Sequence, residues 1–302
     1  MQWRGRRGSS NVEDQRGRSS PGGGFPGGFG RRPGGFPGQG FPGGGRRISL
    51  PRSKAGWVVF LVVIGISIFA AQQERSVGPG GAGGSGGALI QADREAGQFA
   101  SVVLADTEEV WARRFQDELG RRYDPPTLVL FSGSVRSGCG GASAASGPFY
   151  CPLDEKAYLD TDFFDALERR LGARGDFAAA YVIAHEVGHH VQNELGMLER
   201  AQAMKAGLDE AGANAVQVKV ELMADCLAGV WAREAQRMFG SLDEGDVDEA
   251  LNAASRIGDD TLQREAGRTV RPETFQHGTS ADRKAWFATG WNEATIAACD
   301  TF

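Results

Sequence analysis

The sequence predicts an α+β domain, mostly helical with a small sheet, that follows a Gly/Arg-rich N-terminal tail and one long apolar segment. Three observations favour this organisation. Glycine and charge are unevenly distributed, one run of 17 residues carries no charge, and regular hydrophobic patterns begin only near residue 89. A few short strands followed by many helices are typical of an α+β fold. The 302 residues are enough for one large domain or two smaller ones.

Residues 1–54 differ in composition from the rest of the chain. They contain eleven basic and two acidic residues, a net charge of +9, so a total of −5 leaves −14 for the remainder. Residues 21–47 repeat Gly-Phe-Pro-Gly units, which lose much backbone entropy on ordering and bury little apolar surface. We therefore predict a disordered tail over 1–54. RNA or anionic-lipid binding by this tail is a less favoured alternative, and we do not expect nucleic acid as a partner.

The uncharged run AGWVVFLVVIGISIFAA, residues 55–71, predicts a single transmembrane helix over 55–72. At about 1.5 Å per residue it reaches roughly 26 Å, the short end of a bilayer span. A signal peptide would lie nearer the start of the chain, and a buried core helix would show a polar face. Basic residues gather before the run, so the positive-inside rule places the N-terminus in the cytoplasm and the domain across the membrane. The Gly-rich residues 73–88 predict a flexible linker to a domain over 89–302.

The first part of the domain alternates between helix and strand patterns. ADTEEVWARRFQDELGRRY has apolar residues at helical spacing and predicts a helix over 105–123. TLVLFSG predicts a buried strand over 127–133, and FYCPLDEKAYLD predicts one or two short strands over 149–160. TDFFDALERRLG predicts a helix over 161–172, which begins at a capping residue and ends at a glycine.

The rest of the domain reads as helices. Helical spacing and glycine stop signals predict four of them, over 181–196, 213–240, 246–258 and 280–299.

The first of these four helices contains HEVGH and three of the chain's four histidines. Residues i and i+4 lie on one helix face, so His185 and His189 present two imidazoles to one point, a spacing that chelates zinc. Glu186 is displaced by one position and can contact a water without being a ligand. His190 points about 100° away from His189 and is expected to be a neighbour only. A purely structural role for this cluster would be a costly way to build a core.

A third ligand must come from elsewhere, because catalytic zinc takes three protein ligands. ELMAD, in the predicted helix 213–240, offers Glu221 and Asp225 at a spacing of i and i+4. We predict Glu221 as the ligand and Asp225 as the acceptor of a histidine ring N–H, and the exchange of these two roles remains an alternative. Gly188, beside the histidines, would let another segment approach closely.

HEVGH followed by ELMAD resembles the gluzincin metallopeptidases, with their HExxH and ExxxD motifs. Longer phrases resemble the bacterial family described as "putative neutral zinc metallopeptidase". They are WRGRRGSSNVEDQRG, GCGGASAASGPFYCPLD, GDFAAAYVIAHEVGHHVQ, ELMADCLAGVW, IGDD, HGTSADR and the ending CDTF. The resemblance covers nearly all of residues 123–302 and about the first 17. It implies a zincin-like metallopeptidase domain.

The resemblance also implies roles for four residues. One Zn²⁺ per chain would be held by His185, His189 and Glu221, with Glu186 as the catalytic base. We expect hydrolysis of peptide bonds, by a metalloendopeptidase, in which Glu186 takes a proton from a water that zinc activates. The substrate is expected to be a peptide or protein close to the membrane.

The oxyanion of such a reaction needs a further donor. His277 is the candidate for a catalytic role, and Tyr150 and Arg283 are candidates for contact with substrate or oxyanion, because the phrases HGTSADR and GPFYC are polar and flanked by apolar segments. Each of the three can instead be a structural hydrogen-bonding residue. An extended substrate can also pair with the strand around 156–159.

A different class of function remains open for the domain. It can be a catalytically silent binding or scaffold module, stabilised by zinc and tethered to the membrane. Glu186 distinguishes the two, because a purely structural zinc site has a closed fourth position and needs no base.

All four cysteines lie in the acidic part of the chain: Cys139, Cys151, Cys226 and Cys299. Beyond a bacterial inner membrane, in the periplasm or outside the cell, they can form two disulfides with three possible connectivities. We favour Cys139 with Cys151 and Cys226 with Cys299. Free buried thiols are the alternative.

Overall fold

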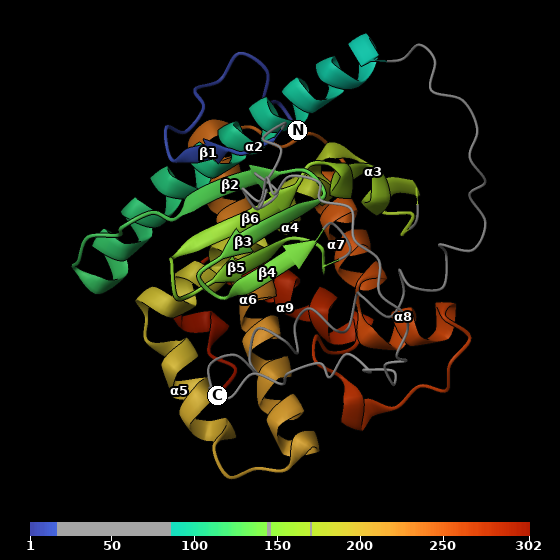
Figure 1. Ribbon diagram of the computed structural model, residues 1–302. Helices are drawn as coiled ribbons and strands as arrows, with labels where there is room; N and C mark the ends of the chain where they lie inside the picture. Colours follow the sequence, from blue (N-terminus) through green and yellow to red (C-terminus); the bar gives the residue numbers. More distant parts are fainter. Residues whose placement is uncertain (17–85, 144–145, 170) are drawn as a thin grey trace, which may run out of the picture.

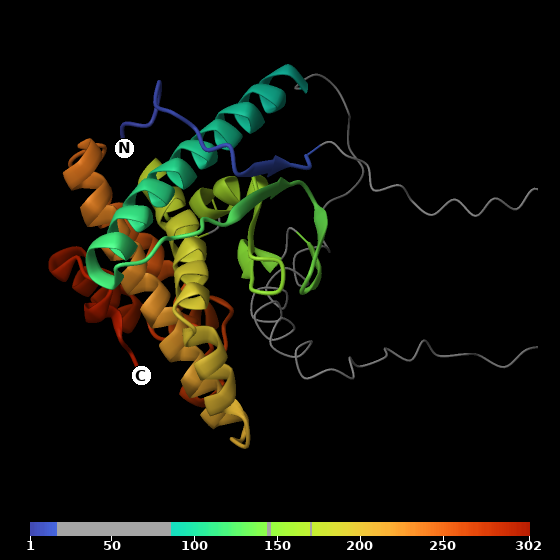
Figure 2. The same ribbon diagram turned by 90° about the vertical axis from the view of Figure 1, so that its left-hand side faces the viewer.

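The computed structural model describes residues 1–16, 86–143, 146–169 and 171–302. A small sheet lies on one side of the molecule and a set of packed helices on the other (Figures 1 and 2). No helix in the described ranges is long and apolar enough to span a membrane. The segment predicted to cross a membrane, 55–72, and the predicted linker as far as residue 85 lie outside the described residues.

The main sheet has four strands in the order β1-β2-β6-β5, of which the first three are parallel and β5 is antiparallel to β6. The strands are β1 (Val12–Asp14), β2 (Thr127–Phe131), β5 (Phe149–Cys151) and β6 (Lys156–Asp160). The strands predicted within 127–133 and 149–160 are thereby confirmed. Because β6 lies between β2 and β5, it has no free edge, and the prediction that a substrate pairs with 156–159 is wrong.

Both faces of β2 are buried, which explains its unbroken apolar sequence. Leu128 and Leu130 face the large core shared with the helices. Val129 and Phe131 face a smaller core that includes Val135 of a hairpin, β3 (Ser134–Ser137) and β4 (Gly140–Ser143). Successive side chains of a strand point to opposite faces, so one continuous apolar run supplies both cores.

The helices confirm the predicted mostly helical class. They are α2 (Gly86–Arg114), α3 (Asp162–Arg169), α4 (Asp176–Glu194), α5 (Met197–Lys205), α6 (Glu210–Phe239), α7 (Asp246–Arg256), α8 (Asp259–Glu265) and α9 (Ser280–Glu293). A π-helical turn (Phe115–Leu119) continues α2, and 3-10 turns occur at Pro272–Thr274 and Ala297–Cys299. The structure differs from the prediction in the early start of α2, in the presence of α5 and α8, and in the end of α9 at Glu293, where a helix over 280–299 was expected.

Residues 1–16 belong to the folded domain and run beside α2 (Figure 2). Trp3 is 6% exposed and packs edge to face on Phe99 of α2, with 5.5 Å between ring centroids. The Arg6 guanidinium donates two hydrogen bonds of 2.6 Å to the buried carboxylate of Asp106. The predicted disordered tail is therefore wrong for residues 1–16, because tertiary contacts order them, while residues 17–54 lie outside the described ranges.

Strand β1 sets a condition on membrane topology. Because it pairs with β2, residues 1–16 and the domain must lie on the same side of any membrane that the chain enters. The predicted orientation, with a cytoplasmic N-terminus and the domain across the inner membrane, does not meet this condition.

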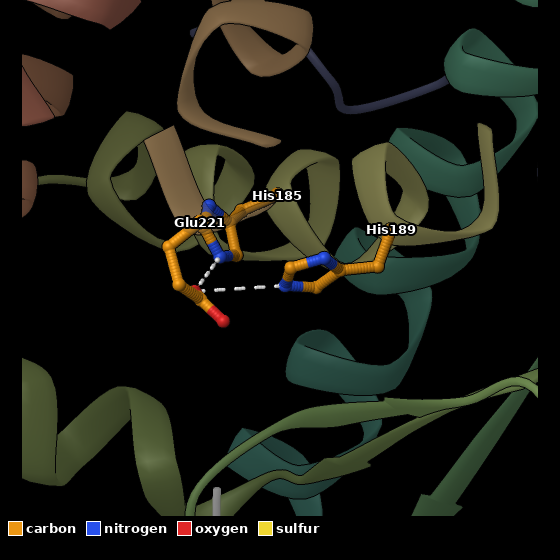
Figure 3. Close-up of side chains that lie close together, drawn as sticks. All are labelled: His185, His189 and Glu221. Atoms are coloured by element: carbon orange, nitrogen blue, oxygen red, sulfur yellow. Dashed lines mark hydrogen bonds and ion pairs between the residues drawn. The ribbon is translucent and has the colours of Figure 1, made fainter. Parts of the chain in front are cut away.

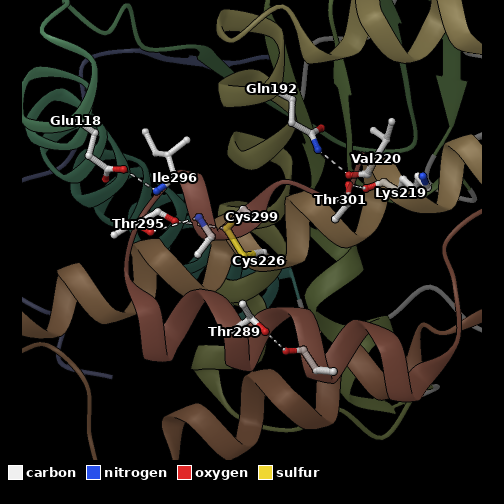
Figure 4. Close-up of a disulfide and its surroundings, with 12 residues drawn as sticks. Glu118, Gln192, Lys219, Val220, Cys226, Thr289, Thr295, Ile296, Cys299 and Thr301 are labelled. Atoms are coloured by element: carbon white, nitrogen blue, oxygen red, sulfur yellow. Dashed lines mark hydrogen bonds between the residues drawn. A yellow bond between two sulfur atoms is a disulfide. The ribbon is translucent and has the colours of Figure 1, made fainter.

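Two disulfides join the four cysteines as predicted. Cys139–Cys151 ties the β3–β4 hairpin to the edge strand β5. Cys226–Cys299 ties α6 to the 3-10 turn near the C-terminus (Figure 4). No described cysteine is free.

Candidate metal centre

Helices α4 and α6 bring together the three residues predicted as metal ligands (Figure 3). His185 Nε2 lies 3.2 Å and His189 Nε2 3.6 Å from the same carboxylate oxygen, Oε2 of Glu221. One ligand atom from each residue lies within 4.8 Å of the others. Two histidines one turn apart on α4 thus face a carboxylate from the neighbouring helix.

The close approach of the two helices depends on Gly188. A Cβ atom at this position would lie 3.0 Å from the backbone oxygen and 3.3 Å from the Cα of Ala224 on α6. The expectation that this glycine admits another segment is confirmed, and the segment is the one that carries Glu221.

The donor atoms fit a zinc ion in kind and in spacing. Two imidazole nitrogens and a carboxylate oxygen are a common donor set of catalytic zinc. Donors about 2.0–2.1 Å from a tetrahedral ion lie roughly 3.3–3.4 Å apart. The observed separations of 3.2 and 3.6 Å between the imidazole nitrogens and the carboxylate oxygen bracket that value.

Asp225 holds the first histidine by its other ring nitrogen. Its Oδ1 lies 2.9 Å from His185 Nδ1, on the opposite side of the ring from Glu221. Burial raises the pKa of Asp225, but the charges of Arg283 and His185 outweigh it and lower that pKa to about 2. The ionised carboxylate accepts the Nδ1–H and directs Nε2 towards Glu221. The geometry therefore matches the favoured roles of Glu221 and Asp225 and not their exchange.

Arg283 lies behind His185 and not at a substrate surface. Its side chain is 1% exposed, and Nε and Nη2 each donate to Asp225 over 2.8 Å. It also donates to the Tyr181 hydroxyl at 3.2 Å and to the Ile257 carbonyl at 3.4 Å. This arrangement differs from the prediction that Arg283 contacts substrate or oxyanion, since its donors are engaged within the protein.

Glu186 is half-buried and lines a small cavity between α4 and the sheet. The other lining residues are Leu128, Pro148, Ala157, Tyr158, Leu159 and Ile183. Burial in these surroundings raises the pKa of the Glu186 carboxyl, although the neighbouring histidines oppose the shift. A carboxyl beside the ligand set with a raised pKa has the properties of a general base.

His277 lies near the ligand set and is held by Asp259. Its Nδ1 is 3.2 Å from Asp259 Oδ1, while Oδ2 accepts backbone N–H groups of residues 276–278. Burial lowers the pKa of His277, but the Asp259 hydrogen bond and the charge of Glu221 raise it overall. No role was predicted for Asp259 from the sequence, although IGDD, the phrase that contains it, is one of those that resemble the family.

Tyr150 and His190 form a pair of their own. His190 Nε2 lies 2.7 Å from the Asp124 carbonyl, which can only accept, so Nε2 carries the hydrogen. His190 Nδ1 therefore accepts from the Tyr150 hydroxyl at 3.0 Å. The tyrosine hydrogen is engaged within the protein, which gives Tyr150 a structural contact and leaves its predicted contact with substrate a prediction.

Residues 1–302 match the protein family described as "Putative neutral zinc metallopeptidase". The chain belongs to this family. The chain is 40% identical over 316 residues to the uncharacterized protein YpfJ of Escherichia coli (strain K12), with 100% of this chain and 99% of that protein aligned. It is 45% identical over 190 residues to the uncharacterized protein Rv2575 of Mycobacterium tuberculosis (strain ATCC 25618 / H37Rv), over 60% of this chain and 63% of that protein. No solved structure shows a significant match.

Proposed function

We propose that the domain hydrolyses peptide bonds in a zinc-dependent reaction with Glu186 as the base. The observation that carries the proposal is that the polar side chains of α4 face different surroundings. His185 and His189 face Glu221, whereas Glu186 lies beside them and faces a cavity. In the described part of the chain no hydrogen bond from another residue reaches the Glu186 carboxylate. A carboxylate in this position is free to exchange protons with a reactant.

His185, His189 and Glu221 would hold the zinc ion, which supplies a Lewis acid that acidifies water and polarises a carbonyl oxygen. Glu186 transfers the proton: it accepts one from the attacking water and passes it to the leaving amine. Its position beside the two histidines and next to the cavity supports this role.

His277 is the residue that we propose to stabilise the oxyanion. Asp259 accepts from Nδ1 and thereby orients the ring, and the raised pKa of His277 favours the form in which Nε2 also carries a hydrogen. The imidazolium would then supply a charged donor close to the ligand set.

The edge strand β5 is the proposed binding site for an extended substrate. No described strand pairs with its outer edge, and Pro148, which precedes it, lines the cavity of Glu186. Strand addition at this edge would place an extended peptide beside the cavity, and we propose that the bond cleaved lies within such a peptide. The proposed class is therefore a metalloendopeptidase.

The proposed location differs from the orientation expected from the sequence. The two disulfides favour an oxidising compartment for the domain. Since β1 joins residues 1–16 to the same sheet, we propose that both lie outside the cytoplasm and that residues 55–72 attach to the membrane without crossing it as a single span. The proposed substrate is a nearby peptide or protein. An N-terminal epitope tag should then be digested by protease added to spheroplasts. A tag that stays protected while the domain is digested would contradict the arrangement.

The test of the reaction uses the full chain, because residues 1–16 are part of the fold. Wild type and Glu186→Gln are purified in detergent, and bound zinc and cleavage of an unstructured protein are measured for both. We expect one zinc in each and cleavage by the wild type alone. One zinc with no cleavage by either protein would favour the alternative, a silent zinc-stabilised module. Absence of zinc from the wild type would refute the site.

A further inference from the structure

A buried glutamine on α4 contacts the second histidine ligand. Gln192 is fully buried, and its Oε1 lies 2.9 Å from Nδ1 of His189. Its Nε2 donates over 2.6 Å to the backbone carbonyl of Val220 on α6, the residue before Glu221 (Figure 4). One side chain thus connects a ligand on α4 to the backbone beside a ligand on α6.

The partners of Gln192 fix the tautomer of His189. A backbone carbonyl can only accept, so the amide nitrogen of Gln192 must face Val220. The amide oxygen then faces His189, and since this oxygen can only accept, Nδ1 of His189 must carry a hydrogen. In the neutral ring Nε2 is therefore the atom with the free lone pair, and it points at Glu221.

A second glutamine orients the carboxylate of Glu221, and the partners of this glutamine fix its own orientation in the same way. Gln217, one turn before Glu221 on α6, donates from Nε2 to Glu221 Oε1 over 2.9 Å. Its own oxygen accepts from the ammonium group of Lys205, which can only donate, so the amide has a single orientation. With Oε1 engaged, Oε2 is the oxygen left to face the two histidines.

We propose that Gln192 and Gln217 are positioning residues that preset His189 and Glu221 for zinc, as Asp225 does for His185. The inference rests on the zinc site of the proposed function. Each ligand then has one partner that engages the atom not needed by the metal. Two of the three partners are neutral amides, so they orient their ligands without adding negative charge to a site that already holds Glu221 and Asp225.

A merely structural role for Gln192 predicts a different behaviour on substitution. If Gln192 only satisfied the buried carbonyl of Val220, its loss would lower the Tm of the metal-free protein. Zinc affinity would then fall only in proportion to that loss of stability. The two roles use different atoms of the amide: the nitrogen bonds Val220 and the oxygen bonds His189. Substitutions that remove one or both of these bonds can therefore separate the roles.

The experiment compares four substitutions in the full chain. Gln192→Met removes both bonds at similar volume, whereas Gln192→Glu keeps an oxygen for His189 and loses the donor to Val220. Gln217→Met removes the donor to Glu221. The matched control is Gln236→Met on α6, which removes an amide oxygen that accepts from the backbone N–H of Leu242.

The measurements are the zinc Kd by competition with a chelator, the absorption spectrum of the Co²⁺ form, and the Tm of the metal-free protein. We expect Gln192→Met and Gln217→Met to weaken zinc binding by about 10- to 100-fold, the usual effect of losing such a partner, and to alter the Co²⁺ spectrum. Of the two variants at residue 192, Gln192→Glu should have the lower Tm and yet bind zinc more tightly than Gln192→Met. Gln236→Met should bind zinc as the wild type does.

Three results would overturn the inference. Kd values of the two methionine variants within twofold of wild type would show that the amides do not act on the metal. An affinity that merely follows Tm across all the variants, Gln236→Met included, would leave the glutamines a structural role only. A wild-type chain that binds no zinc would overturn the proposed metal site itself, a result distinct from the other two.

Discussion

Replacing Arg283 by methionine should destabilise the domain far more than the loss of a surface ion pair. Asp225 is 0% exposed, and two of its hydrogen bonds, both 2.8 Å, come from Arg283. Arg283→Met removes the guanidinium from this buried carboxylate and leaves it His185 and the Tyr181 hydroxyl as partners. Breaking a buried pair by removing one partner costs about 3–5 kcal/mol. For a domain of this size each kcal/mol lowers Tm by about 2–4 °C. The metal-free Arg283→Met chain should therefore melt roughly 6–20 °C below the wild type.

The same substitution should change how stability depends on pH. The folded pKa of Asp225 is about 2, below the value of 3.8 for a free aspartate, so the pair stabilises the wild type above pH 4. That contribution, roughly 2 kcal/mol, is lost as pH falls from about 4 towards 2. In Arg283→Met the guanidinium no longer opposes the effect of burial, so the pKa of Asp225 rises and the carboxylate takes up a proton at a higher pH than in the wild type. Lowering the pH from 7 to 4 should therefore reduce the difference in Tm between this variant and the wild type.

The control is Arg169→Met, which removes the guanidinium from an ion pair with Asp165 in which the two side chains are 76% and 70% exposed. Exposed pairs contribute about 0–1 kcal/mol, so this variant should melt within about 4 °C of the wild type. The measurement is thermal unfolding of both metal-free variants followed by circular dichroism between pH 7 and pH 4. If Arg283→Met melted no lower than Arg169→Met, Arg283 would not compensate the charge of Asp225, and the role given to Arg283 and Asp225 behind His185 would be wrong.

Three other predictions concern how the domain is held together. Arg6→Met should lower Tm more than Arg7→Met does, because Arg6 is 24% exposed and pairs with a buried aspartate whereas Arg7 is 60% exposed; equal shifts would argue against docking of residues 1–16. Gly188→Ala should cost about 1–3 kcal/mol and weaken zinc binding, since its Cβ would press α6 away at 3.0 Å, and unchanged melting and zinc affinity would contradict this. Replacing the Cys226–Cys299 pair by alanines opens a 73-residue loop and should lower the free energy of unfolding by about 4 kcal/mol, against about 3 kcal/mol for Cys139–Cys151. Urea unfolding of the oxidised chains compares the two losses.

The cluster of His185, His189 and Glu221 could be predicted because each half of it is local in sequence. Two histidines at i and i+4 must share a helix face, and the same holds for Glu221 and Asp225 on α6. The contact between the halves is not local, but a glycine beside the histidines indicated that a segment would come close, and Ala224 does. Helical periodicity also gave most of the element order, since the apolar runs and glycine stops lie within each element.

Residues 1–16 could not be placed by the same reasoning. Val12–Asp14 is short and mostly polar, and it becomes a strand only because β2 offers it an unpaired parallel edge. The Gly-rich composition that follows suggested a disordered tail, although Trp3 and Arg6 each have a buried partner on α2.

For Arg283 the sequence showed a polar residue in an apolar setting, which fits a substrate contact as well as an internal one. Only the position of Asp225 in space distinguishes them.

Helix α4 shows what polar residues in an apolar helix imply. Its core positions are covered by α2, α6, α7 and the sheet, so every polar side chain needs a partner from another segment or from a neighbouring turn. His185 has Asp225, His189 has Gln192, and His190 has the Tyr150 hydroxyl. The sequence could indicate that such partners exist, but their identity depends on how the helices pack. Glu186 is the exception among these residues, since it faces a cavity. This difference between the three histidines and the carboxyl supports the proposed role of Glu186 as the base.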